Sequence, residues 1–395
     1  SSAGVPIRKV TVGIAGKHIR SLQHSDYIMR EHPDKFITDD DIEALKDQVK
    51  KLVMLPGEEI IHVLPQEYKV DSEGEIQEPV GMHGKRLEAN FHVVVGQMGS
   101  IRNIARCVRE AGLEMEALTL EPLASSEAVL TKEEKEAGVA IVDIGGGTTD
   151  IAIFKDNIIR HTCVIPYGGG IITEDIKEGC SIIEKHAEQL KVKFGSAVPE
   201  LEKDSTFVTI PGLHGRPDKE ISLKTLAQII NARVEEVLEM VNTELKAYGA
   251  FEQKKKLIAG IVLTGGGSNL KHLRQLANYT TGFDSRIGFA NEYIANDKNQ
   301  YLKGPEFATS IGLLMESLKI RDKRLNIDEE VEPVVNEQPK PETTSVQAET
   351  VQPIQQAAPV QEQPVSDQKQ ENRRAKLTFG QSLMEKVKKF FEEVE

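Results

Sequence analysis

The sequence predicts an α/β fold in which short apolar strands lead into glycine turns. One such turn follows the apolar run at 139–144, and a second follows the apolar run at 259–264. Helical patterns lie between these strands and after them, as is typical of α/β architecture. A length of 395 residues, with 39% hydrophobic and 28% charged residues, favours two or more globular domains.

The composition excludes several classes of protein. A formal net charge of −13 argues against broad nucleic-acid binding, and more than half of that excess falls between 328 and 371. No run approaches the ~20 apolar residues of a membrane span, and the N-terminus lacks a signal-peptide pattern. The three cysteines, Cys107, Cys163 and Cys180, have no metal or redox spacing. We interpret them as reduced thiols in a cytosolic protein.

The first part of the chain predicts a strand followed by a compact α+β module. The strand at 8–14 begins almost at once and no initiator Met is present, so we expect a chain that lacks its natural beginning. The module would occupy 17–90, with a helix at 42–55 and strands at 59–64 and 87–95. An Asp run before the helix suits its N-terminal cap. We interpret this stretch as an inserted interaction module.

An acidic residue then stands where a strand meets a helix. After a helix at 101–111 and a strand at 116–120, Glu121 and Pro122 open a further helix. One interpretation of Glu121 is a solvated carboxylate. The other is an acid that positions water or a metal ion beside Asp143.

The central stretch of the chain is a hairpin whose turn is made of glycine. Asp143 ends the first strand, and the turn residues are Gly145, Gly146, Gly147, Thr148 and Thr149. Glycine lets the backbone approach an anion closely, and the threonines can add hydroxyl donors. Asp143 could hold a hydrated Mg²⁺ or orient a water. An ordinary hairpin is the alternative, but the order Asp-x-Gly-Gly-Gly-Thr-x-Asp favours a phosphate cradle.

The rest of the globular part predicts more helices around a second glycine turn. We expect a strand at 157–165, a helix that ends at residue 180 and a second helix at 182–194. A hairpin within 206–221 and helices at 222–248 and 305–318 should follow. The second turn consists of Gly265, Gly266, Gly267 and Ser268. A helix starting near Leu270 would aim N–H groups at a phosphate or ribose edge. Neither the P-loop nor the dinucleotide fingerprint is present.

The C-terminal part predicts a disordered linker, 325–375, and an amphipathic helix, 376–395. The linker is rich in Pro, Gln and acid and cannot bury a core. On a helix, one arc collects the apolar residues Phe379, Leu383, Met384, Val387, Phe390 and Phe391, with Lys386 and Lys389 among the polar residues opposite. This helix could dock on the globular part. A long tether instead favours a membrane surface or a partner, and the basic residues favour anionic lipid.

Both glycine turns resemble motifs of the actin, heat-shock-chaperone and sugar-kinase superfamily. Residues 143–150 look like its second phosphate loop, and 260–267 look like its adenosine loop. The resemblance implies a two-lobed, actin-like ATPase fold that holds ATP and Mg²⁺ between the lobes. Glu121 resembles the acid before the interlobe helix of the chaperones. Glu188 and Lys191, three apart and on one helix face, resemble a pair that contacts the adenosine in several members.

A closer resemblance is to the FtsA family of bacterial cell-division proteins, over about residues 10–320. The motifs that carry it lie at 15–19, 62–68, 79–82, 123–126, 160–162 and 164–167. The resemblance implies subdomain 1A at 1–16 and 91–137, 1C at 17–90, 2A at 138–181 and 257–324, and 2B at 182–256. The family's first hairpin, with the other phosphate loop, would precede Val10, so subdomain 1A would be incomplete.

The family resemblance also implies a function and partners. The protein would tether filaments of the tubulin-like protein FtsZ to the cytoplasmic face of the plasma membrane at the division site. It would bind the C-terminal tail peptide of FtsZ through 182–256, other division proteins through 17–90, anionic lipids through the tail, and copies of itself. No nucleic acid is expected, and ATP would act as a switch, with slow hydrolysis or none. The alternatives are a small-molecule kinase or a pilus-assembly ATPase of the same superfamily.

Overall fold

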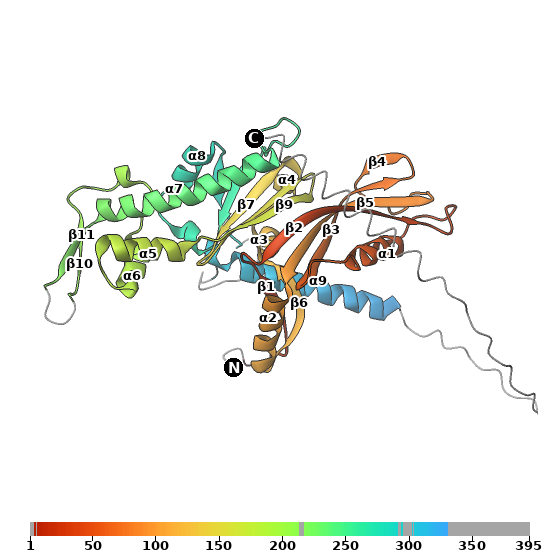
Figure 1. Ribbon diagram of the computed structural model, residues 1–395, viewed down its shortest axis with the longest axis horizontal. Coiled ribbons are helices and arrows are strands. Elements are labelled where there is room, and N and C mark those ends of the chain that lie inside the picture. Colours follow the sequence, from red (N-terminus) through yellow and green to blue (C-terminus); the bar gives the residue numbers. More distant parts are fainter. Residues whose placement is uncertain are drawn as a thin grey trace, which may run out of the picture. The chain divides into compact units, whose positions relative to one another are not determined.

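The computed structural model describes residues 4, 6–212, 217–290, 294, 302 and 304–330, with the backbone alone for 323–330 (Figure 1). The predicted amphipathic helix and most of the predicted linker lie outside the described residues. Among the described residues, no helix is both long and apolar enough to cross a membrane. The strands of the described part form sheets of five, four, two and two strands.

The five-stranded sheet has the order β13-β12-β7-β8-β9. Its strands are β7 (Val139–Ile144), β8 (Thr149–Lys155), β9 (Ile158–Ile165), β12 (Ile261–Thr264) and β13 (Ser285–Ile287). Every residue of β7 and β12 is buried, which explains their unbroken apolar runs. Because β7 and β12 are parallel neighbours, with Thr264 opposite Asp143, the two glycine turns leave the same edge of the sheet.

Helices cover both faces of this sheet (Figure 1). On one face lie α5 (Gly169–Cys180), α7 (Leu223–Tyr248) and α8 (Leu273–Thr281), and α6 (Glu184–Phe194) packs on α5. On the other face lie α3 (Glu121–Val129) and α9 (Ala308–Glu330), with the short α4 (Lys132–Ala137) nearby. The strand β7 alternates between these cores, with Val142 on the first side and Ile141 on the second. Helix α9 continues past the predicted linker boundary at residue 324.

Two smaller sheets flank the five-stranded one. The hairpin β10 (Phe207–Ile210) and β11 (Lys219–Ser222) precedes α7 and confirms the predicted hairpin. The strands β1 (Lys9–Ile14) and β6 (Glu114–Leu120) form a parallel pair, with α2 (Met98–Glu110) ahead of β6. Since α3 follows β6 without a loop, Glu121 is held at the junction of strand and helix.

The remaining sheet belongs to the inserted module and has the order β2-β5-β3-β4. Its elements are β2 (Ile19–Met29), α1 (Asp39–Lys50), β3 (Glu58–Val70), β4 (Glu73–Ile76) and β5 (Arg86–Gln97). The predicted bounds of α1, 42–55, are wrong. The helix starts earlier because Thr38 is its N-cap, whose N–H donates to the Asp41 carboxylate at 3.1 Å.

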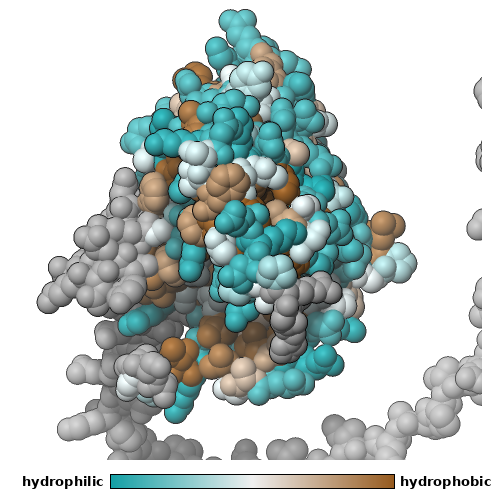
Figure 2. Space-filling view, turned by 90° about the vertical axis from the view of Figure 1, so that its left-hand side faces the viewer, coloured by the Kyte–Doolittle hydropathy of each residue, from teal (hydrophilic) through white to brown (hydrophobic). Residues whose placement is uncertain are grey.

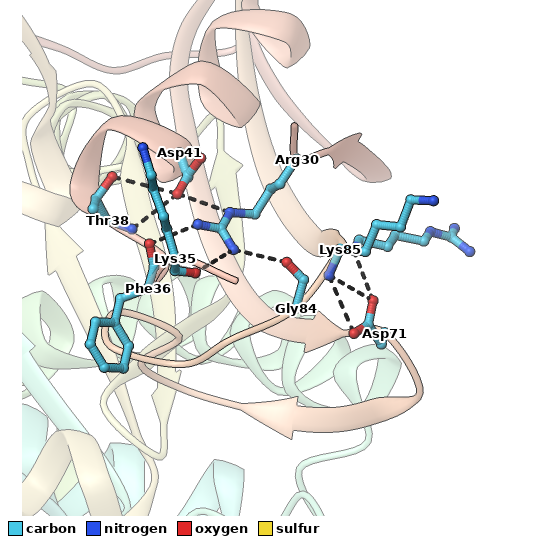
Figure 3. Close-up of polar contacts among 9 residues, drawn as sticks. Arg30, Lys35, Phe36, Thr38, Asp41, Asp71, Gly84 and Lys85 are labelled. Carbon is cyan, nitrogen blue, oxygen red and sulfur yellow. Dashed lines mark hydrogen bonds and ion pairs between the residues drawn. The ribbon is translucent and has the colours of Figure 1, made fainter. Parts of the chain in front are cut away.

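A buried arginine joins three segments of the module (Figure 3). The guanidinium of Arg30 donates to the carbonyls of Lys35 (3.1 Å), Phe36 (2.7 Å) and Gly84 (2.8 Å). Its Nε also lies 3.1 Å from Asp41 Oδ2, and the Arg30 side chain is only 5% exposed. One side chain therefore fixes the end of β2, the loop before α1 and the loop before β5.

A partly buried histidine, His62, and a buried one, His92, connect the module to the neighbouring elements. His62 Nε2 accepts a hydrogen bond from the Leu120 N–H at 3.0 Å, and His92 Nε2 lies 2.9 Å from Thr162 Oγ1. Burial lowers the pKa of each imidazole to about 4. Both histidines are therefore neutral near pH 7 and act as hydrogen-bonding groups in the contact.

Candidate functional site

The two glycine turns pack directly against each other at the edge of the central sheet. Gly265 has φ +81, and a Cβ built on it would lie 2.2 Å from Asp143 Oδ1. A Cβ on Gly267 would lie 2.4 Å from the Ile144 side chain. Glycine at these two positions lets the second turn approach the end of β7.

The start of helix α5 packs onto the first turn. Gly169 N–H donates to the Gly145 carbonyl at 2.8 Å, and Gly170 N–H donates to the Gly146 carbonyl at 2.7 Å. A Cβ on Gly168 would lie 2.5 Å from the Gly145 oxygen. The glycines at 168–170 thus hold the first turn in place, which the sequence pattern alone did not predict.

A pocket of about 380 Å³ opens where the turns meet α5 and α6. It is lined by Gly145, Gly146, Gly169, Ile172, Glu188, Lys191, Val192, Gly195, Gly266, Gly267, Asn269, Leu270, Lys271 and Glu306. Six residues of the predicted site are brought together here, namely Gly145, Gly146, Glu188, Lys191, Gly266 and Gly267. Its volume lies at the lower end of the range typical of small-molecule sites.

The pair Glu188 and Lys191 forms a fixed ionic corner of this pocket. Lys191 Nζ lies 2.7 Å from Glu188 Oε2 and donates to the Gly169 carbonyl at 2.8 Å and to Thr173 Oγ1 at 2.7 Å. Burial raises the pKa of Glu188, but the hydrogen bonds from Lys191 and Thr173 outweigh it, so the pKa lies below its ordinary value. These two side chains therefore offer charged, hydrogen-bonding groups to a ligand in the pocket.

A group of carboxylates lies behind the first turn. Asp143 is buried, and its Oδ2 accepts hydrogen bonds from Ser125 Oγ (2.6 Å) and Thr309 Oγ1 (3.1 Å). Burial raises the pKa of Asp143 despite these bonds. Burial and the charge of Asp143 also raise the pKa of Glu121. The structure thus places Glu121 in electrostatic reach of Asp143.

Asp150 completes this acidic group. Its Oδ2 accepts from Thr148 Oγ1 at 2.8 Å, whereas its buried Oδ1 has no hydrogen-bond partner among the described residues. Burial first, and then the charges of Asp143 and Glu121, raise the pKa of Asp150 to about 7. Three carboxylates with raised pKa values and an unpaired oxygen fit a hydrated Mg²⁺, because a hard cation prefers oxygen ligands and would offset their repulsion.

Replacing Asp150 with Asn should stabilise the metal-free protein at pH 8. A carboxylate whose pKa is about 7 in the folded state and 3.8 ordinarily destabilises the fold as the pH rises through this interval. We expect a gain of a few kcal/mol, since a tenfold change in a protonation equilibrium corresponds to about 1.4 kcal/mol. Urea unfolding in EDTA would measure it. The gain should vanish near pH 4, and an equal gain at both pH values would contradict this assignment.

The other predicted site residues do not line the pocket. Three of them carry hydroxyl groups that already donate hydrogen bonds within the chain. Thr148 donates to Asp150, Thr149 donates to the Tyr167 carbonyl (2.8 Å), and Ser268 donates to the Thr264 carbonyl (2.6 Å). These side chains hold the turns in shape. Gly147 and Gly265 also lie in the turns but outside the pocket lining. The predicted membrane-binding residues in 376–395 lie outside the described residues.

The predicted helix start near Leu270 is wrong. The second turn instead forms a 3-10 helix, η2 (Gly266–Asn269), and α8 begins at Leu273. Sequence reasoning also missed Asn269, whose Nδ2 donates to Glu306 Oε2 at 2.8 Å beside the pocket. Glu306 belongs to η4 (Pro305–Phe307), far along the chain, so no local signal connects the two. Asp150 could have been found, because it ends the Asp-x-Gly-Gly-Gly-Thr-x-Asp motif.

Comparisons with known proteins found matches over most of the chain. A family model described as "Cell division protein FtsA" matches residues 140–312, and one described as "SHS2 domain inserted in FTSA" matches residues 16–95. The chain is 38% identical over 318 residues to the cell division protein FtsA of Pseudomonas aeruginosa, covering 80% of this chain and 74% of that protein. It is 34% identical over 334 residues to that of Escherichia coli K12, covering 84% and 78%.

Among solved structures, the fold is similar to a chain of the PilM–PilN type IV pilus biogenesis complex. The TM-score is 0.54 at 17% identity, and the match covers 78% of this chain and 79% of that chain. This likeness, together with the family models, confirms the predicted actin-like ATPase fold with an inserted α+β subdomain. The identity of 34–38% to the two FtsA proteins, over about four fifths of this chain, shows the family as well as the fold. The chain belongs to the FtsA family of cell-division proteins.

Proposed function

We propose that the pocket between the two glycine turns binds ATP. The observation that carries this proposal is the convergence on one pocket of both turns and the Glu188–Lys191 pair. Backbone N–H groups of the turns suit phosphate, and the ionic corner suits the polar edge of a nucleoside. The subdomains predicted from the sequence, 1A, 1C, 2A and 2B, are the units that we propose to respond to the nucleotide.

Mg²⁺ would be held on the side of the first turn that carries Glu121, Asp143 and Asp150. When bound, the ion would offset the negative charge of these carboxylates and of the ATP phosphates. Ser125 and Thr309 orient Asp143 by hydrogen bonds, so its carboxylate is fixed before any ligand arrives. We propose that ATP serves as a conformational switch for self-association. Rapid phosphoryl transfer to a sugar or an acid would instead support a small-molecule kinase.

We propose that the region 182–256 binds the tail peptide of FtsZ. Large apolar side chains are exposed there, and away from the nucleotide pocket they are Ile183 (38%), Leu201 (56%), Phe207 (56%) and Phe251 (53%). Figure 2 faces the end of the lobe with β10 and β11, where hydrophobic side chains stand in separate groups among hydrophilic ones. Such scattered apolar positions suit an extended peptide better than a large flat partner. The module at 17–90 is the proposed contact for other division proteins.

The C-terminal residues 376–395 are the proposed attachment to the cytoplasmic face of the membrane. Their apolar arc, from Phe379 to Phe391, would enter an anionic lipid surface while the lysines contact headgroups. Each fully buried side chain contributes about 1.5–3 kcal/mol, less when insertion is partial. A protein held in this way and bound to FtsZ would tether division filaments at the membrane.

Co-sedimentation with anionic liposomes tests this attachment. The full chain should pellet with the vesicles, and a chain ending at Asn372 should stay in solution. A full chain with Phe390 and Phe391 replaced by Glu should behave as the shortened one, whereas replacement of Ser382 by Ala should change nothing. Equal pelleting of the full and shortened chains would refute membrane attachment by this segment.

A further inference from the structure

A group of three metal-ligating side chains lies outside the candidate nucleotide site. His161 and Cys163 are two residues apart on β9 and therefore face the same side of the sheet, toward the core that contains α7. Glu244 projects from α7 toward them. One nitrogen, the thiol sulfur and one carboxylate oxygen all lie within 4.8 Å of one another.

The imidazole of this group is held in place, but its Nε2 atom makes no hydrogen bond among the described residues. His161 Nε2 is buried and has no hydrogen-bond partner among the described residues, although it lies 3.5 Å from Glu244 Oε2. The ring of Tyr248, one turn of α7 beyond Glu244, stacks on the imidazole with 6.4 Å between centroids. A buried ring nitrogen that makes no hydrogen bond is costly, and this one faces a carboxylate and a thiol that hydrogen-bond to each other. A ligand shared by the three groups would satisfy the nitrogen.

We propose that His161, Cys163 and Glu244 bind a divalent transition-metal ion of the Zn²⁺ class. Zinc takes nitrogen, thiolate and carboxylate ligands at ~2.0–2.3 Å, so ligands in a tetrahedral site stand roughly 3.3–3.8 Å apart. The separation of 3.5 Å between His161 and Glu244 already falls in this range. A thiol ligand disfavours Mg²⁺, which prefers oxygen. The metal would displace the Cys163 proton to solvent, and the thiolate and carboxylate would balance the charge of the ion.

The site has access to solvent and a place for a fourth ligand. His161 lines a cavity of about 850 Å³, and Cys163 lines another of about 250 Å³. Water from either cavity can complete a coordination shell of three protein ligands. A bound ion would join β9 to α7, and β9 is also the strand whose Ile159 carbonyl accepts from Gln66 of the inserted module at 2.6 Å. The ion would thus stabilise the part of the lobe that contacts the module.

Titration of the full chain with Co²⁺ tests the proposal, because a thiolate ligand gives Co²⁺ an intense near-ultraviolet charge-transfer absorption. The titration is made without nucleotide and in excess Mg²⁺, which would fill the proposed oxygen site around Asp143. We expect saturation at one ion per chain, with Zn²⁺ displacing Co²⁺. Cys163→Ser should remove the absorption, and Glu244→Gln should weaken Co²⁺ binding by at least ~10–100-fold, the loss that even outer contacts of a metal site cause.

The other cysteines provide matched controls. Cys107→Ser and Cys180→Ser should retain the Co²⁺ absorption, since both thiols lie outside the group. Circular dichroism and the unfolding midpoint report whether each variant is folded, and Glu244→Gln keeps the test available if Cys163→Ser is not. An absorption that survives both Cys163→Ser and Glu244→Gln would overturn the proposal, as would the absence of saturable binding to the native chain.

Discussion

Replacing Gly146 with Val is expected to abolish ATP binding while leaving the folded state intact. Gly146 lines the pocket, and a Cβ built on it meets no atom of the described residues within 4 Å. The isopropyl group would therefore occupy space that belongs to the ligand. We expect ATP affinity, measured by isothermal titration calorimetry in Mg²⁺, to fall by at least ~100-fold, equivalent to about 2.8 kcal/mol at 1.4 kcal/mol per tenfold.

Gly147 offers a matched control in the same turn. It too has open space around a built Cβ, but it does not line the pocket. Gly147→Val should therefore reduce ATP affinity much less than Gly146→Val, and urea unfolding should be similar for both variants. Equal loss of ATP binding in the two variants would show that the turn as a whole, and not this pocket, determines affinity.

Replacing Arg30 with Met should strongly destabilise the inserted module. The substitution leaves the carbonyls of Lys35, Phe36 and Gly84 without their donor, and Asp41 keeps only its contacts with Thr38 (Figure 3). Since the Asp41 side chain is 26% exposed, the loss comes mainly from the three carbonyls, and each buried group left unpaired costs about 1–3 kcal/mol. Urea unfolding should show this loss in the free energy of unfolding.

Arg20 in the same module is the control for Arg30. Its Nη2 lies 2.6 Å from Glu58 Oε2, but the Arg20 side chain is 43% exposed. The pair is bidentate, but its exposed arginine limits its contribution to about 1 kcal/mol, so Arg20→Met should cost much less than Arg30→Met. A loss for Arg30→Met no larger than that for Arg20→Met would mean that the buried guanidinium does not organise the module.

The central sheet could be predicted from the sequence because its strands are apolar in a regular way. All six residues of β7 are buried, Gly138 precedes the strand, and Asp143 and Gly145 stand at its other end. Strand β2 was missed, since Ser21 and Gln23 interrupt its apolar pattern. These side chains donate to the carbonyls of Thr162 and Arg160 on the neighbouring lobe, at 3.2 and 3.5 Å. The polar pattern thus serves a contact that no local pattern reveals.

The candidate site was predictable where its chemistry is local. Glu188 and Lys191 are three residues apart on one helix face, and this spacing predicted that their side chains are in contact. The support of Asp143 was not predictable, because Thr309 lies on a helix far along the chain. The same holds for the proposed metal ligands, since Glu244 is distant in sequence from Cys163 and the cysteines show no spacing pattern.

Hydrogen exchange with and without ATP and Mg²⁺ tests most directly whether the two turns form one nucleotide site. Backbone amides that bind a phosphate or become covered exchange more slowly. The account predicts slower exchange at 145–149 and at 265–270 together, at the same ATP concentration, and loss of both effects in Gly146→Val. Protection in one turn alone, or in neither turn while ATP binds, would contradict it.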